Sequence, residues 1–97
     1  MQDLSQQFVK DIADVVWADL KPHAKRDAII LVHPGLDLVD VATAIANDNV
    51  KKVNPWIQES LIQKPSADQL ATWNLSPTQS FQTLIVQPYV LVVEKTP

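Results

Sequence analysis

The sequence predicts an α+β fold in which four to five helices pack on a small antiparallel sheet of two to three strands. Three observations support this prediction. Apolar residues recur at helical spacing over most of the chain, residues 28–33 and 81–95 are rich in branched apolar residues, and turn-forming residues separate these segments. A chain of 97 residues has room for one hydrophobic core, so we expect a single domain over residues 1–97.

Two helices are expected before the first strand. Apolar residues at every third or fourth position predict a helix over residues 3–16, with Asp3 as its N-cap. The stretch WADLKPHAKR predicts a second, shorter helix over residues 17–26, with Asp19 as its N-cap. The lysines of this second helix are expected to point into the solvent.

A strand and a third helix follow. The stretch AIILVH, residues 28–33, is apolar on both faces and stops at a Pro-Gly pair, which is typical of a short buried strand. Asp37 is expected to cap the helix that comes next. The run Asn47-Asp48-Asn49 favours a turn at the end of that helix.

The segment 50–62 allows two interpretations. Its apolar residues form one helical stripe, which favours a single helix kinked at Pro55. The alternative is a helix that begins afresh with Asn54 as N-cap and Pro55 at the first helical position. In either case, the segment and the helix before it form a helix-turn-helix-like pair in the middle of the chain.

The last part of the chain predicts a helix and a long strand region. Ser66 and Gln69 have the spacing of a capping box, which predicts a helix over residues 66–74. Pro88 interrupts the strand region 81–95 and cannot donate to a sheet ladder. The region therefore contains a bulge, a bend or an edge at Pro88, or it folds there into a hairpin.

The two strand regions also predict self-association. Both are apolar on both faces, and such strands need cover above and below. Because we expect the helices to cover one face only, a second copy of the chain is the economical cover, and we expect a homodimer. The alternative is a monomer in which the hairpin at Pro88 completes a three-stranded sheet.

Composition argues against several classes of function. The net charge of −3 argues against a nucleic-acid partner, and the absence of cysteine excludes disulfides and thiolate metal sites. No apolar run is long enough to cross a membrane, and the start of the sequence lacks the pattern of a secretory signal, so we expect a cytoplasmic protein. No cofactor is expected. The single glycine predicts few backbone positions with positive φ.

The leading functional hypothesis is a non-enzymatic interaction or regulatory module. Its expected contact residues are Lys51, Lys52, Trp56, Tyr89, Leu91 and Val93. The first alternative is a winged-helix-like protein that binds nucleic acid through residues 49–56. The second is an enzyme or metal site that uses His33 and Asp37, with His23 as a further polar candidate. Enzymatic activity is the less favoured interpretation, because no base, nucleophile and orienting group can be matched in the sequence.

Three stretches together resemble a known family. They are WADLKPHAKRDAIILV, LDLVDVATAIANDN and FQTLIVQPYVLVVE, of which LIVQPYVL is the most specific. With the segment between the last two, the chain resembles the domain-of-unknown-function family numbered 2288, a set of small bacterial proteins. The resemblance implies a stand-alone bacterial protein and brings no catalytic residue with it. Pro55 departs from the continuous helix that we expect in this part of the family.

Overall fold

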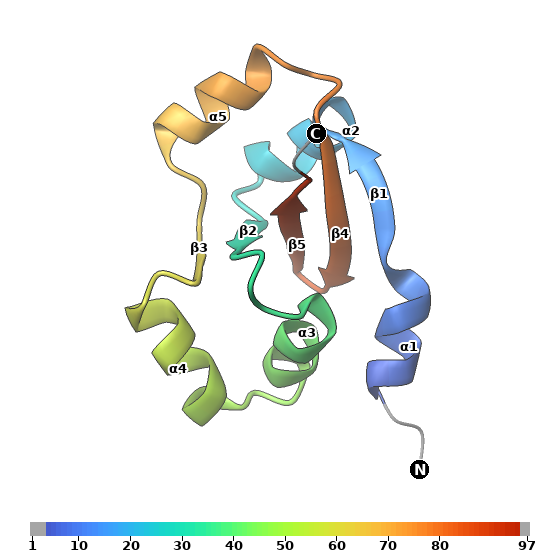
Figure 1. Cartoon of the computed structure of the whole chain (residues 1–97), viewed down its shortest axis with the longest axis vertical. Helices are drawn as coiled ribbons and strands as arrows, with labels where there is room; N and C mark the ends of the chain where they lie inside the picture. Colours follow the sequence, from blue (N-terminus) through green and yellow to red (C-terminus); the bar gives the residue numbers. More distant parts are fainter. Residues whose placement is uncertain (1–3, 96–97) are drawn as a thin grey trace.

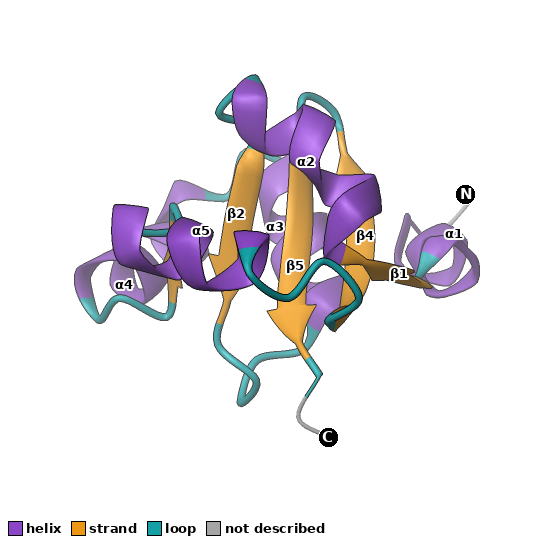
Figure 2. Cartoon of the chain, turned by 90° about the horizontal axis from the view of Figure 1, so that it is seen from above, coloured by secondary structure: helices purple, strands orange, loops and turns teal. Residues whose placement is uncertain are grey.

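The computed structural model describes residues 4–95, and over this range helices and strands are interspersed in an α+β fold (Figure 1). The helices are α1 (Leu4–Asp11), α2 (Trp17–Lys25), α3 (Leu38–Ala46), α4 (Val50–Gln58) and α5 (Ala67–Asn74). The strands are β1 (Ala13–Val16), β2 (Ile29–Val32), β3 (Ile62–Gln63), β4 (Ser80–Val86) and β5 (Tyr89–Glu94). The helices lie on both faces of the sheet (Figure 2).

The sheet is larger than the expected two to three antiparallel strands. Over the described residues it has five strands in the order β1-β4-β5-β2-β3. It is also mixed, because β2 pairs with β5 in parallel while the other neighbours are antiparallel. The two additional strands, β1 and β3, are short and come from segments whose apolar spacing predicts helix. The extra strands place the parallel pair β2 and β5 inside the sheet.

The first predicted helix is wrong in its second half. Helix α1 ends at Asp11, and residues 13–16 form β1, which pairs with β4. The hydroxyl of Thr83 donates a hydrogen bond to the carbonyl oxygen of Ala13 over 3.0 Å and helps to hold β1 on β4. This pairing spans most of the chain, so local periodicity carries no information about it. The expected cap, Asp3, lies outside the described residues.

The start of α2 also differs from the prediction. The helix begins at Trp17, so Asp19 lies in its first turn and is not its N-cap. A cap is not needed, because the first two backbone donors have partners in the loop before β4. The N–H of Trp17 donates to the carbonyl of Gln79, and that of Ala18 donates to the carbonyl of Pro77, each over 3.0 Å.

The caps predicted for α3 and α5 are confirmed. The Asp37 carboxylate accepts a hydrogen bond from the N–H of Val39 over 2.9 Å. Ser66 and Gln69 form both bonds of the capping box, over 3.1 Å and 2.9 Å.

Helix α4 is one helix that runs through Pro55, as the favoured interpretation of this segment predicted. The alternative that begins a helix at Asn54 is therefore wrong, and Asn49 is the N-cap. The helix nevertheless stops at Gln58 instead of Ile62, because Ile62 pairs with Val32 as part of β3. Pro55 is exposed, so its ring meets solvent and not another element.

Three helices end in the same way, and none of them uses glycine. Asp27, Asp48 and Ser60 follow α2, α3 and α4 and have φ values of 57°, 55° and 58°. At each end two backbone bonds close the last turn, such as Leu61 N–H to the carbonyl of Trp56 over 2.8 Å and Ser60 N–H to the carbonyl of Ile57 over 3.0 Å. Positive φ is therefore confined to few positions over residues 4–95, as expected, although aspartate and serine and not glycine occupy these three.

The strand region that contains Pro88 folds into a hairpin. Strands β4 and β5 pair along their length, from Phe81 opposite Glu94 to Val86 opposite Tyr89, and the peptide bond before Pro88 is cis. The hairpin, one of the arrangements that the sequence allows at Pro88, is therefore confirmed. Its strands form the inner part of the sheet, between β1 and β2.

The hairpin and β2 separate two apolar layers. The aliphatic layer lies against α1 and α3, with α4 at its margin, and its buried members include Val41, Leu84 and Leu91. The aromatic layer lies under α2 and α5 and is centred on Trp17, Trp73 and Phe81. One chain thus covers both faces of its sheet, so the argument that a second copy must provide this cover does not hold.

Candidate functional site

Helix α4 carries three of the six expected contact residues and is weakly attached to the fold. It has no buried residue, although its sequence is amphipathic. Lys51 and Lys52 are exposed, whereas Trp56 is half-buried and packs on the aliphatic layer. Val50 and Ile57 are apolar, yet 55% and 54% of their surface is exposed. The helix therefore presents apolar surface that the chain itself does not cover.

A shallow hollow of about 180 Å³ extends this apolar surface onto neighbouring elements. Its lining residues come from α3, α4, the turn between them and β5, and are Ala44, Ile45, Asp48, Asn49, Val50, Val53 and Tyr89. Tyr89 is 38% exposed at the start of β5. We call the group Val50, Val53, Ile57 and Tyr89 the α4 surface.

Two of the expected contact residues do not belong to this surface. Leu91 is fully buried in the aliphatic layer, and Val93 is half-buried against it. Their strand, β5, has partners on both sides and offers no edge for another strand. The prediction of an open edge on the second strand region is therefore wrong, because that region folds back on itself at Pro88.

The polar candidates are not brought together. Asp37 caps α3, while the Nδ1 atom of His33 accepts a hydrogen bond from the N–H of Gly35 over 2.9 Å. His23 lies on α2, where its Nδ1 accepts a hydrogen bond from the guanidinium of Arg26. Within residues 4–95, no three histidine or acidic side chains are grouped so that they could hold a metal ion.

His33 instead lines a hollow of about 220 Å³ at the carboxyl ends of β2 and β5. The polar residues of its lining are His33, Ser60, Gln63 and Glu94. The Glu94 carboxylate already accepts a hydrogen bond from the Trp73 indole. Ser60 carries a hydroxyl, but over the described residues it has no hydrogen bond to His33, whose Nδ1 is bonded to Gly35 N–H, and the hollow has no oxyanion donor set, so we assign no reaction to it.

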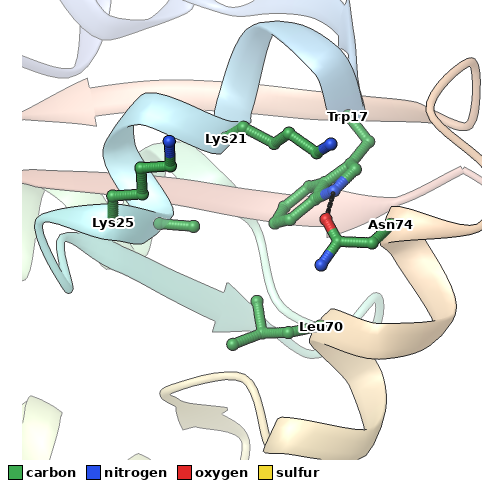
Figure 3. A pocket seen from close by; sticks show the side chains of 6 residues that line it. Trp17, Lys21, Lys25, Leu70 and Asn74 are labelled. Atoms are coloured by element: carbon green, nitrogen blue, oxygen red, sulfur yellow. Dashed lines mark hydrogen bonds between the residues drawn. The ribbon is translucent and has the colours of Figure 1, made fainter.

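A larger cavity, of about 350 Å³, lies between α2 and α5 (Figure 3). Trp17, Lys21, Ala24 and Lys25 line it from α2, and Leu70 and Asn74 line it from α5. The Trp17 indole N–H donates to Asn74 Oδ1 over 2.8 Å, as the dashed line in Figure 3 shows. We call these six residues the α2–α5 cavity.

Lys21 and Lys25 are exposed, as the sequence predicts, but the sequence analysis did not predict that they also line a cavity. The missed signal is the spacing of Trp17, Lys21 and Lys25, which lie four residues apart and therefore on one side of α2. The second wall comes from Leu70 and Asn74, about fifty residues further along the chain. No local pattern connects these residues to α2.

One lysine has a shifted pKa. Lys64, just after β3, donates to the carboxylate of Asp27, and this hydrogen bond and the negative charge of Asp27 raise the pKa of Lys64. The contact links the loop after β3 to the end of α2. Both side chains are largely exposed, so this ion pair holds the loop only weakly.

No helix in the described range combines the length and the apolar character needed to span a bilayer.

Comparison with known proteins gives two matches. A family model described as "Protein of unknown function (DUF2288)" matches residues 3–94. The NMR solution structure of PA1075 from Pseudomonas aeruginosa is similar in fold, with a TM-score of 0.82 and 29% sequence identity, and the match covers 100% of this chain and 89% of that chain. Among curated proteins, none matches this sequence.

Proposed function

Because the chain belongs to DUF2288, a family of unknown function, its role has to be argued from its own surface, and we propose that it is a non-enzymatic interaction module that forms a homodimer through the α4 surface. The observation that carries this proposal is the combination of amphipathic sequence and missing burial in α4. When a partner covers the exposed apolar side chains of a helix, the free energy falls, because apolar surface is removed from water.

The charges around α4 favour a second copy as the partner. Lys51 and Lys52 are in its first turn, and Glu59 follows its last residue. In a two-fold pair of antiparallel α4 helices, the basic end of each helix meets the acidic end of the other. Val50, Val53 and Ile57 then lie along the shared seam.

The dimer that we propose is weak and depends on concentration. Each chain already covers both faces of its own sheet, so folding does not require the partner. The α4 surface contains only four apolar residues, which is small compared with obligate interfaces. Such an interface suits regulated association, in which a modest change in concentration or a competing partner shifts the population.

Sedimentation equilibrium from low to high micromolar concentration tests this proposal. We expect the apparent mass to rise from 10.8 kDa towards twice that value with concentration. Ile57→Asp should abolish the rise, because a charge in the seam would have to lose its water. Val9→Asp is the matched control, since Val9 is 60% exposed on α1, away from the α4 surface, and we expect it to leave association unchanged.

Two outcomes would contradict the proposal. One is a constant mass of 10.8 kDa at all concentrations. The other is equal loss of association in the two variants, which would show that α4 is not the interface. Circular dichroism of both variants shows that the change in mass does not come from unfolding.

The structure gives little additional support to nucleic-acid binding. Helices α3 and α4 contact each other as a consecutive pair, and Lys51 and Lys52 are accessible. Arg26, however, follows α2, which belongs to the opposite layer of the sheet. The cations are therefore not gathered on one face for phosphate contacts, and we retain the protein–protein interaction as the proposed function.

A further inference from the structure

We propose that the α2–α5 cavity binds a small organic carboxylate with an apolar body. The proposal is independent of the α4 surface, which belongs to the other layer of the fold. The cavity volume, about 350 Å³, lies at the lower end of the range found for small-molecule sites.

The apolar part of the ligand is argued from the cavity wall. The half-buried Ala24 methyl group and Leu70 side chain line it from two helices, and the Trp17 ring, which is 1% exposed, forms its floor. Trp17 is held in place, because its ring contacts Trp73 and Phe81 at centroid distances of 5.0 Å and 5.9 Å and its N–H is bound to Asn74. A rigid aromatic wall of this kind costs little conformational entropy when a ligand packs on it.

The anionic part is argued from the donors. Lys21 and Lys25 extend from the same side of α2, and no acidic side chain lines the cavity in the part of the chain that the structure describes. Neither lysine takes part in the ion pairs found over residues 4–95, which join Lys64 to Asp27 and Lys95 to Asp14. Two lysines at this spacing repel each other, and an anion placed between them removes that repulsion.

Asn74 adds a neutral donor. Its Oδ1 accepts the hydrogen bond from the Trp17 indole, and this bond directs the amide nitrogen away from the indole (Figure 3). One amide group thus orients the aromatic ring and supplies N–H donors to the same cavity that Lys21 and Lys25 line. Two ammonium groups and an amide fit the two oxygens of a carboxylate, while the remaining wall fits hydrocarbon.

An NMR titration of the full chain with phenylacetate tests the proposal. We expect saturable shifts of the Trp17 indole N–H signal and the Asn74 side-chain NH₂ signals, and no shift of the Trp56 indole signal on the other layer. The neutral analogue 2-phenylacetamide should bind much more weakly, because it lacks the charge. Absence of saturable shifts with phenylacetate would overturn the proposal.

Matched variants separate the site from general electrostatics. Lys21→Met with Lys25→Met should weaken phenylacetate binding roughly tenfold or more, because two charge-assisted contacts are lost. Lys51→Met with Lys52→Met makes the same change of net charge on α4 and should leave the affinity unchanged. Equal loss in the two double variants would overturn the assignment.

Two further arms test the shape and the head group. Ala24→Leu adds volume to the cavity wall without removing a charge, and we expect it to block binding while the protein stays folded. Unchanged affinity in this variant would contradict binding in the cavity. Phenyl phosphate distinguishes the anion class, and tighter binding of phenyl phosphate than of phenylacetate would overturn the assignment of a carboxylate.

Discussion

The aromatic layer and α4 represent two different ways of holding a helix in place. Trp17, Trp73 and Phe81 are at most 1% exposed, and their ring centroids lie 5.0–5.9 Å apart, so α2 and α5 are attached through large buried rings. Helix α4 has no buried residue. Half-buried side chains attach it to the fold, and its cap stabilises only the start of the helix. Buried rings fix a helix through tertiary packing, whereas caps fix only its own ends.

This difference separates folding from interaction in the molecule. Both buried tryptophans also satisfy their indole N–H groups, at Asn74 and at Glu94, so the aromatic layer is polar only at its rim. We therefore expect substitutions in the aromatic layer to change the free energy of unfolding, and substitutions on α4 to change association. The predictions below test that division.

Truncation of the aromatic layer should have the largest effect. Trp73→Ala removes a fully buried ring and is expected to lower the free energy of unfolding by about 3–5 kcal/mol. Trp56→Ala removes a half-buried ring of α4 and should cost less than half as much. Urea denaturation followed by circular dichroism measures both values.

Trp73→Phe gives a graded check if Trp73→Ala does not fold. It keeps an aromatic ring at this position but loses the hydrogen bond from the indole N–H to Glu94. Because Glu94 is exposed, its carboxylate can bind water instead, so the variant should retain most of the stability. Equal costs for Trp73→Ala and Trp56→Ala would contradict the distinction between the two regions.

Removal of a cap should have a smaller effect. Ser66→Ala removes one bond of the capping box of α5 and is expected to cost about 1 kcal/mol. Asn49→Ala removes the cap of α4, whose hydrogen bond to Lys52 N–H is long at 3.4 Å, and should cost less. A larger loss for Asn49→Ala in urea denaturation would show that α4 depends on its cap more than this geometry indicates.

A glycine at a helix end should stabilise the protein. Ser60→Gly relieves a side chain at φ 58° after α4, and we expect a gain of about 0.5–1 kcal/mol after the added freedom of the unfolded chain is subtracted. Thermal denaturation of the variant should show a higher midpoint. An unchanged or lower midpoint would show that the serine hydroxyl stabilises this turn.

The exposed ion pair should have the smallest effect. The pKa of Lys64 is raised by its hydrogen bond to Asp27 and by the negative charge of that residue, so the pair stabilises the fold below the ordinary pKa of lysine and loses this contribution as pH rises through the raised value. Because both groups are exposed, Lys64→Met should change the unfolding free energy at neutral pH less than the other variants. Any difference from the unmodified chain should disappear in strongly alkaline solution.

Locally encoded features could be predicted from the sequence. The caps Asp37 and Ser66 depend on side chains within three residues of the helix start, and both are where the pattern indicates. Burial of Trp73 and the partial burial of Trp56 also follow from the rule that large aromatic residues belong to the core or its rim.

Features that depend on distant partners could not be predicted. Residues 13–16 continue the helical stripe of α1, and only their pairing with β4 makes them a strand. Residue 62 likewise continues the stripe of α4 but pairs with β2. The wall that α5 contributes to the α2–α5 cavity is equally invisible in a local pattern, because α2 and α5 are far apart in the chain.

The order of strands in the sheet has a consequence for synthesis of the protein. The central hairpin, β4 and β5, leaves the ribosome after every other helix and strand of residues 4–95, and β1, β2 and β3 have no complete sheet to join before it emerges. Until then, the structure is limited to the helices, the contacts between helices and the two-residue pairing of β2 with β3. The nascent chain therefore stays open until this hairpin has emerged, and the segment LIVQPYVLVV is the part that most needs protection from aggregation as it emerges.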